Sequence, residues 1–262
     1  MLYIEKKAVP RVVNTKVAEI KSSPRWREVD QQDTETLRAL FDELPKDDIR
    51  TSLHAEQHGL CAYCMARLNS NGTHTTIEHW SPLSKDKDNA LDYHNFLLVC
   101  KGGGDVSEDS FAGKRILCCD ASKKDQEILL DPQDREMMSH IAYKKDGIIE
   151  FRPSAETGRW NQESAARFNR ELNEVLCLNG KLEKNNSRTD TATQVMKGRR
   201  DAWAAGESII RRLKAKDAYS SAQIRKHIEA LKSAQPREPF VGVTIFYLER
   251  AYRKRMAMEK SR

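Results

Sequence analysis

The sequence contains no apolar run that approaches the ~20 residues needed to cross a bilayer. Its first residues, MLYIEKKAVPRVV, lack the apolar centre of a signal peptide. It shows no internal repeat and no low-complexity tract, and no G-x-x-x-x-G-K-[ST] motif for a nucleoside triphosphate. We therefore expect a cytoplasmic, globular protein that has no P-loop ATPase site of its own.

Six cysteines are present. In the cytoplasm such residues are metal ligands or free thiols more often than disulfides. The 262 residues suffice for one large domain or two modest ones, and 39% hydrophobic residues are enough to build a core. The cysteines are therefore the first place to look for a metal site.

Positive charge is concentrated at one end of the chain. Residues 197–262 hold 17 Lys and Arg against 7 Asp and Glu, although the net charge of the whole chain is only +6. Such an excess suits a polyanion or an acidic partner, and it equally suits a solvated helical surface. The charge bias alone does not decide between these two interpretations.

The hydrophobic pattern predicts mostly helices around a short region of another kind. Residues 1–25 appear irregular, residues 61–125 are rich in loops, and Asp146-Gly147 predicts a hairpin over 138–152. Apolar residues recur at helical spacing in most of the remaining chain. The helices expected on this basis cover residues 33–44, 46–58, 163–179, 187–215, 219–234 and 241–258.

The spacing Cys61-x-x-Cys64 fits two ligands of one tetrahedral zinc ion, with each sulfur about 2.3 Å from the metal. The same spacing occurs in redox pairs, but no βαβ pattern surrounds it here. Cys100 ends the stretch NFLLVC, and Cys118 and Cys119 follow a glycine-rich insertion. The other two ligands are expected among these three residues, whereas buried free thiols are the alternative.

The stretch TIEHW places Glu78 beside His79 after a β-type segment. A carboxylate binds a hard divalent cation, and an imidazole can take a proton from water. Phosphodiester hydrolysis needs both functions. Asn95, further downstream, could orient the imidazole or the loop that carries it.

Together, the segments CAYC, IEHWSP, YHNFLLVC and CDASKKD resemble the HNH endonucleases, whose ββα-metal motif carries an acid–histidine pair, a central asparagine and a closing cysteine element. The closer resemblance is to the PtuB family, the nuclease subunits of Septu anti-phage systems that also occur with some retrons. The motif match covers about residues 54–125 and is weaker beyond them.

The resemblance implies a structural zinc ion held by Cys61, Cys64, Cys100 and Cys119. Cys119 is preferred to Cys118 because many family members place their last metal ligand directly after the final cysteine. The gap between the third and fourth cysteines is longer than usual, because residues 101–117 form an insertion.

The resemblance also implies the catalytic roles. His79 corresponds to the general base, Glu78 to the metal-binding acid and Asn95 to the central asparagine. Asp120 stands where many members have an Asn or His metal ligand, and Lys123 corresponds to a lysine that contacts phosphate. Two carboxylates would favour Mg²⁺ or Mn²⁺ as the catalytic metal.

The expected fold is α+β and predominantly helical, with a zinc-stapled HNH ββα-metal core. An N-terminal helical segment (1–60) would pack on the nuclease core (61–152), and a helical C-terminal region (153–262) would bind a partner or nucleic acid. The expected function is phosphodiester hydrolysis, with DNA favoured over RNA, in a complex with a PtuA-like ATPase. The alternative is a zinc-stapled module that binds nucleic acid or protein and has a degenerate catalytic centre.

Overall fold

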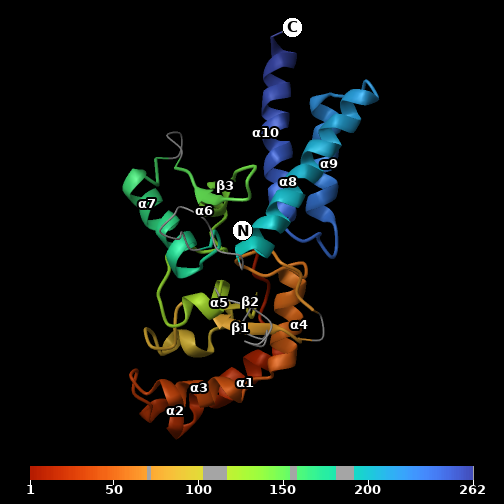
Figure 1. Cartoon of the computed structure of the whole chain (residues 1–262). Helices are drawn as coiled ribbons and strands as arrows, with labels where there is room; N and C mark the ends of the chain where they lie inside the picture. The colour runs from red at the N-terminus through yellow and green to blue at the C-terminus, as the bar shows by residue number, and fades with distance from the viewer. Residues whose placement is uncertain (70–71, 103–116, 154–157, 181–191, 262) are drawn as a thin grey trace, which may run out of the picture.

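A computed structural model describes residues 1–69, 72–102, 117–153, 158–180 and 192–261. Over these residues the chain is mostly helical, with two small sheets of two antiparallel strands each, which confirms the predominantly helical α+β class. Figure 1 shows the first helices at one end of the molecule and the last three at the other. Among the described residues, no helix is both long and apolar enough to span a membrane.

The N-terminal segment forms four helices. They are α1 (Arg11–Ser22), α2 (Pro24–Glu28), α3 (Thr34–Asp42) and α4 (Lys46–Glu56). The prediction that residues 1–25 are irregular is confirmed for 1–10 and wrong beyond them, because both prolines lie where helices accept them. Pro10 is the N-cap of α1, and Pro24 is the first residue of α2. Val13 and Ile20, two turns apart on α1, are buried against the core. Helices α3 and α4 confirm the predictions for 33–44 and 46–58.

The first sheet pairs β1 (Thr75–His79) with β2 (Phe96–Cys100), and Glu78 lies opposite Leu97. The loop between the strands contains two 3₁₀ turns, η1 (Asp88–Leu91) and η2 (Tyr93–Asn95). The short helix α5 (Cys119–Lys123) then packs against β2. Two strands and a helix therefore follow one another, and the insertion expected at 101–117 lies almost entirely outside the described residues.

The second sheet is the predicted hairpin, β3 (Ile141–Tyr143) with β4 (Ile149–Phe151), preceded by α6 (Arg135–Ser139). Gly147 adopts a φ of 89° in the turn, a value that side chains other than glycine rarely accept. Helix α7 (Gln162–Arg170) packs against β4 and continues into the π-helical turn η4 (Glu171–Val175). The backbone N–H of Cys119 donates to the carbonyl of Leu176 at 2.9 Å, which ties this segment to α5.

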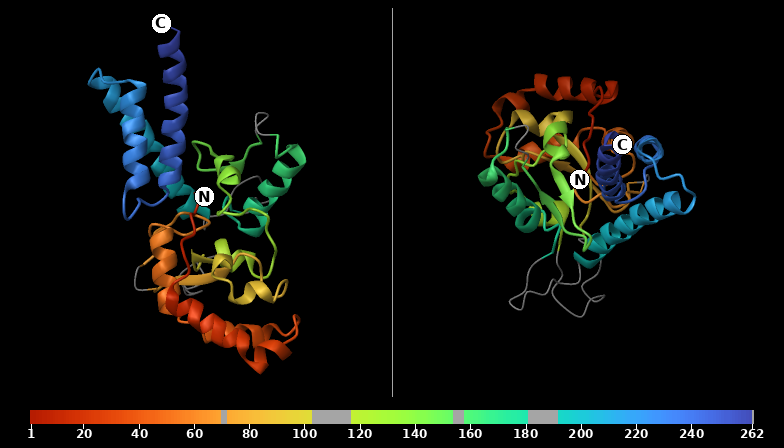
Figure 2. Two further views of the ribbon diagram at one scale, coloured as in Figure 1. Left: turned by 180° about the vertical axis from the view of Figure 1, so that it is seen from behind. Right: turned by 90° about the horizontal axis from the view of Figure 1, so that it is seen from above.

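Of the last three helices, the first two both pack on the third. They are α8 (Ala192–Ala215), α9 (Ser221–Ser233) and α10 (Val241–Lys260). A Cβ at Gly198 would lie 2.2 Å from the Phe240 ring, so the approach of α8 to the start of α10 requires glycine there. These helices confirm three predictions, except that residues 187–191 lie outside the described part of the chain. Figure 2 shows from two further directions that they project from the rest of the molecule.

Candidate active site

Four cysteines from three separate segments meet in one cluster. Their sulfur atoms all lie within 4.8 Å of one another, and they belong to Cys61, Cys64, Cys100 and Cys119. The Sγ–Sγ distance is 3.9 Å between Cys61 and Cys119, and 3.7 Å from Cys100 to Cys64 and to Cys119. Four sulfurs each about 2.3 Å from a zinc ion would be about 3.8 Å apart in a regular tetrahedron. The cluster could therefore hold a metal ion such as zinc.

The backbone around the cluster also suits thiolates. The N–H of Cys100 donates to the Cys61 sulfur, and the N–H of Ala66 donates to the Cys64 sulfur, both at 3.4 Å. Hydrogen bonds of this kind favour the charged form of an acceptor. Hydrogen bonds from the neighbouring thiols lower the pKa of Cys100, and the largest effect comes from Cys118. The hydrogen bond between Cys64 and Cys100 raises the pKa of Cys64.

Cys118 lies beside the cluster without belonging to it. The four sulfurs that converge include Cys119, which is fully buried, whereas Cys118 is partly exposed and is the N-cap of α5. Its N–H donates to the carbonyl of Gly102 at 3.1 Å. The geometry therefore favours Cys119 as the fourth ligand, as the alignment of the motif does.

Glu78 is held by two donors below the surface. Its Oε1 atom lies 2.6 Å from the Nζ of Lys123 and accepts a hydrogen bond from the Tyr63 hydroxyl at 3.3 Å. Burial, with a hydrogen bond to the Asp120 carboxyl, raises the pKa of Glu78 to about 8. The Lys123 ammonium opposes this shift but does not outweigh it. Glu78 is buried, whereas the neighbouring Asp120 is partly exposed.

Glu78, His79 and Asp120 line one cavity of about 160 Å³, which we call the carboxylate cavity. β1 contributes the first two residues and α5 contributes the third. The rest of its wall is formed by Arg38, Thr76, Ile77, Pro82, Leu83, Lys124 and Asp125. The structure therefore brings together the predicted base and both predicted ligands of the catalytic metal.

His79 is enclosed by aromatic rings. Phe41 from α3 and Phe96 from β2 approach its imidazole edge-on, with ring centroids 4.5 Å and 5.0 Å away. Its Nε2 lies 3.1 Å from the carbonyl oxygen of Ala90, so Nε2 carries the hydrogen and Nδ1 keeps a lone pair. Burial lowers the pKa of His79 to about 4, so the ring is neutral at pH 7 and can accept a proton.

Asn95 holds the loop that carries Ala90, whose carbonyl oxygen is the hydrogen-bond partner of His79. Its amide oxygen accepts from the Ser81 N–H at 2.8 Å, and its amide nitrogen donates to the carbonyls of Ser81 and Asn89 at 2.9 and 3.0 Å. Asn89 directly precedes Ala90, whose carbonyl fixes the imidazole. Asn95 is buried and does not line the carboxylate cavity, so of its two predicted roles the geometry supports fixing the loop.

Lys123 is buried and paired in this arrangement, which weighs against the predicted phosphate contact. Its side chain is 0% exposed, and its Nζ binds Glu78 and also donates to the backbone carbonyl of His79 at 3.1 Å. Cys119 and Lys123 lie one turn apart on the inner face of α5, so the same packing that buries the cysteine buries the lysine.

Two cations that line the carboxylate cavity were not assigned a role from the sequence. Lys124 follows the last residue of α5, and Arg38 comes from α3, some 40 positions before His79. Arg38 lies outside the segment that carries the motif, so no local spacing could have indicated it. Only the packing of α3 against η1 brings it to the site.

No protein-family model matches the chain, and no curated protein matches it either. The function must therefore be inferred from the motifs and from the geometry of these side chains.

Proposed function

We propose that the chain is a metal-dependent HNH endonuclease that hydrolyses phosphodiester bonds in nucleic acid. One observation carries the proposal: the carboxyls of Glu78 and Asp120 meet in the same small cavity as the neutral imidazole of His79. A pure binding module has no need of a buried proton acceptor beside paired carboxylates.

The order of elements supports an HNH ββα-metal core. β1 and β2 pair antiparallel, α5 packs against β2, and the site residues lie at the end of β1 and in the first turn of α5. Zinc held by the four cysteines would join Cys61 and Cys64 to the end of β2 and the start of α5. It would thus fix the separation between Glu78 and Asp120.

Each residue has a distinct chemical task under this proposal. Glu78 and Asp120 would bind Mg²⁺ or Mn²⁺, which would offset charge on the scissile phosphate and its leaving oxygen. His79 would take a proton from the attacking water through Nδ1, while Ala90 holds the opposite nitrogen. Lys123 would orient the Glu78 carboxyl, whose ionised form the bound metal would favour, and Asn95 would keep the Ala90 carbonyl in place.

We propose DNA, in preference to RNA, as the substrate and a PtuA-like ATPase as the partner, in cytoplasmic anti-phage defence. The resemblance to the PtuB family supports both, together with the excess of Lys and Arg in residues 197–262. Exposed basic residues such as Arg211 and Arg212 on α8 suit either an acidic partner surface or a nucleic-acid backbone.

The experiment that tests the proposal compares the purified chain, alone and with its candidate ATPase, on plasmid DNA and on total RNA. Each reaction is run with Mg²⁺, with Mn²⁺ and with EDTA, beside a His79→Ala variant. Cleavage that requires the metal and is lost with His79 supports the nuclease. Binding without cleavage under every condition would instead favour the zinc-stapled binding module.

A further inference from the structure

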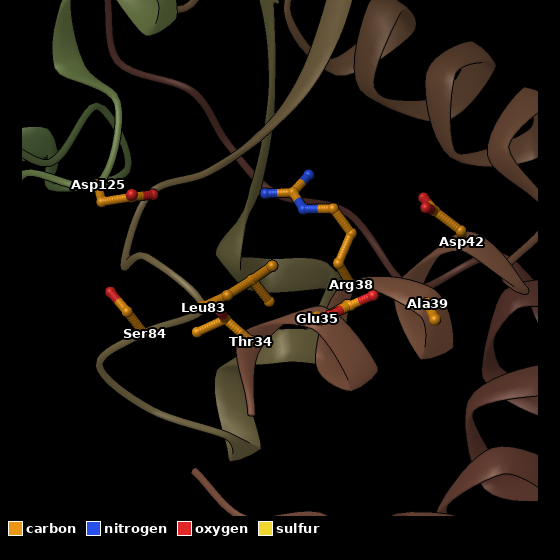
Figure 3. Close-up of a pocket in the computed structure, with 8 residues that line it drawn as sticks. All are labelled: Thr34, Glu35, Arg38, Ala39, Asp42, Leu83, Ser84 and Asp125. Carbon is orange, nitrogen blue, oxygen red and sulfur yellow. The ribbon is translucent and has the colours of Figure 1, made fainter. Parts of the chain in front are cut away.

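Two cavities meet at helix α3. One is the carboxylate cavity, and the other, which we call the α3 cavity, has a volume of about 530 Å³ and lies along α3 (Figure 3). Arg38, Leu83 and Asp125 line both of them. The two cavities are thus neighbours that share part of their walls, one beside the carboxyls of Glu78 and Asp120 and the other along α3.

Arg38 lines both cavities although its own helix offers acceptors. Glu35 precedes it by three residues and Asp42 follows it by four, the spacings at which ion pairs form on a helix. Within the described residues Arg38 forms no ion pair with either, and Asp42 pairs with Lys46 at 3.3 Å. Figure 3 shows the guanidinium raised from the helix, between Asp42 and Asp125.

Helix α3 holds Arg38 at a fixed place relative to His79. Phe41, one turn further along α3, packs edge-on against the imidazole with ring centroids 4.5 Å apart. Leu37 and Leu40 anchor the same helix in the core, at 0% and 2% exposure. The same packing that encloses the proposed base therefore positions the backbone of Arg38, whose side chain is exposed.

The site needs a phosphate-binding cation, and Lys123 is committed to Glu78. The cations that line the carboxylate cavity are Arg38 and Lys124. Arg38 stands at the boundary with the α3 cavity, and a guanidinium presents a planar fork that matches two phosphate oxygens. A volume of about 530 Å³ is within the range of pockets that hold a small ligand.

We propose that Arg38 binds a substrate phosphate next to the scissile one, and that the α3 cavity receives the adjoining nucleotide. The inference rests on the proposed nuclease function, and it makes α3 part of the active site. Arg38 would then set which phosphate enters the carboxylate cavity.

The test is a double-substitution cycle between the protein and the nucleic acid. Oligonucleotides carry one neutral methylphosphonate at each position in turn, and their binding to His79→Ala protein is compared with their binding to the Arg38→Ala/His79→Ala protein. We expect Arg38→Ala to weaken binding roughly tenfold. At one position the methylphosphonate should weaken binding to the Arg38 protein by the same factor and leave the Arg38→Ala protein unaffected.

Arg38→Lys should retain part of the affinity, because the charge remains and the fork is lost. Arg11→Ala is the matched control, since Arg11 is exposed on α1 and lines neither cavity. Additive losses at every position, equal binding by both proteins, or no binding by either would overturn the role of Arg38.

Cleavage by the unsubstituted protein is measured separately. A clear cycle without any cleavage would defeat the nuclease and leave the phosphate contact standing.

Discussion

The carboxylate of Glu78 lies 2.6 Å from the ammonium of Lys123, and both side chains are buried. The adjacent carboxyl of Asp120 adds a second acid to the same position. The three groups bring more negative than positive charge when fully ionised, which is costly away from water. A bound divalent cation would reverse that balance, so metal binding, ionisation of Glu78 and stability should be linked.

Without added Mg²⁺ or Mn²⁺, stability should fall as pH rises between about 6.5 and 8. The folded pKa of Glu78 is about 8, against an ordinary 4.5, so above pH 4.5 the unfolded chain releases a proton that the folded chain retains. The His79 pKa is lowered from 6.5 to about 4, so its contribution is complete above 6.5 and rises with pH only below that value. Melting curves at several pH values measure the slope.

Adding Mg²⁺ or Mn²⁺ should flatten this slope, because the metal favours the ionised carboxyl. Glu78→Gln is the control and should remove both the slope and the metal effect. Equal melting temperatures at pH 6.5 and 8 without added Mg²⁺ or Mn²⁺ would contradict the link.

Cys61→Ser should lower zinc content and solubility together. Structural zinc binding contributes folding free energy on the order of 10 kcal/mol in small modules, and here the ion would join three segments of the chain. Elemental analysis and soluble yield are the measurements. Cys118→Ser is the matched control and should be mild, because its sulfur is not among the four that converge. Well-folded protein without zinc would refute the assignment.

His79→Ala should reduce cleavage by about 10²–10⁴-fold or more, because the proton acceptor is lost. The substitution should also lower the free energy of unfolding by about 1–3 kcal/mol, because the Ala90 carbonyl loses its hydrogen-bond donor. It also removes the ring that packs against Phe41 and Phe96. His79→Gln can restore a donor without a comparable base. We expect it to recover stability but not cleavage, as single-turnover rates and thermal melts would show.

Asn95→Ala should reduce cleavage only in part. It removes three hydrogen bonds that hold the loop, including the one to Asn89 beside Ala90, but leaves the base itself in place. A melting temperature that falls together with the rate is the expected pattern. A loss of rate as complete as that of His79→Ala at unchanged stability would show that Asn95 takes part directly in the chemistry.

Arg211→Glu with Arg212→Glu should weaken assembly with the partner or binding to nucleic acid, at unchanged zinc content. If phosphates are the target, the dependence of log K on log salt should become shallower by about 0.9 for each lost contact. Titrations at several salt concentrations would measure this. Arg199 must be excluded from such tests, because it is 2% exposed and its guanidinium donates to the Leu178 carbonyl, so its loss would disturb the core. If assembly, affinity and salt dependence all stay unchanged, Arg211 and Arg212 belong to a solvated surface that binds neither partner nor nucleic acid.

The sequence predicted the parts of the site that depend on local spacing. Short spacings indicated the C-x-x-C pair, the acid–histidine pair and the residue after Cys119. The two cysteines lie in the four-cysteine cluster, and Glu78, His79 and Asp120 line one cavity, as expected. Burial was harder to predict. Lys123 has the position of a phosphate contact in the motif, but on a five-residue helix its side chain shares the face of Cys119 and is enclosed.

Packing between the motif and the rest of the chain could not be predicted. Arg38 and Phe41 belong to a helix whose periodicity was recognised, but nothing in the sequence shows that this helix packs against η1 and reaches His79 at the end of β1. The early helices were missed for a different reason. Pro10 and Pro24 indicate irregular chain in isolation, whereas at a helix start the missing N–H costs little.

Phe41 lies within the first 60 residues, ahead of the cysteine cluster. A shortened protein that begins after them would keep every proposed zinc ligand as well as Glu78, His79 and Asp120. One side of the imidazole, however, would then face water, and its pKa would return toward 6.5, because burial is the main cause of its depression. The two strands and α5 are therefore not a transplantable catalytic unit by themselves. Grafted into another protein, they would carry the metal ligands but would need α3 with them to keep the histidine neutral at mildly acidic pH.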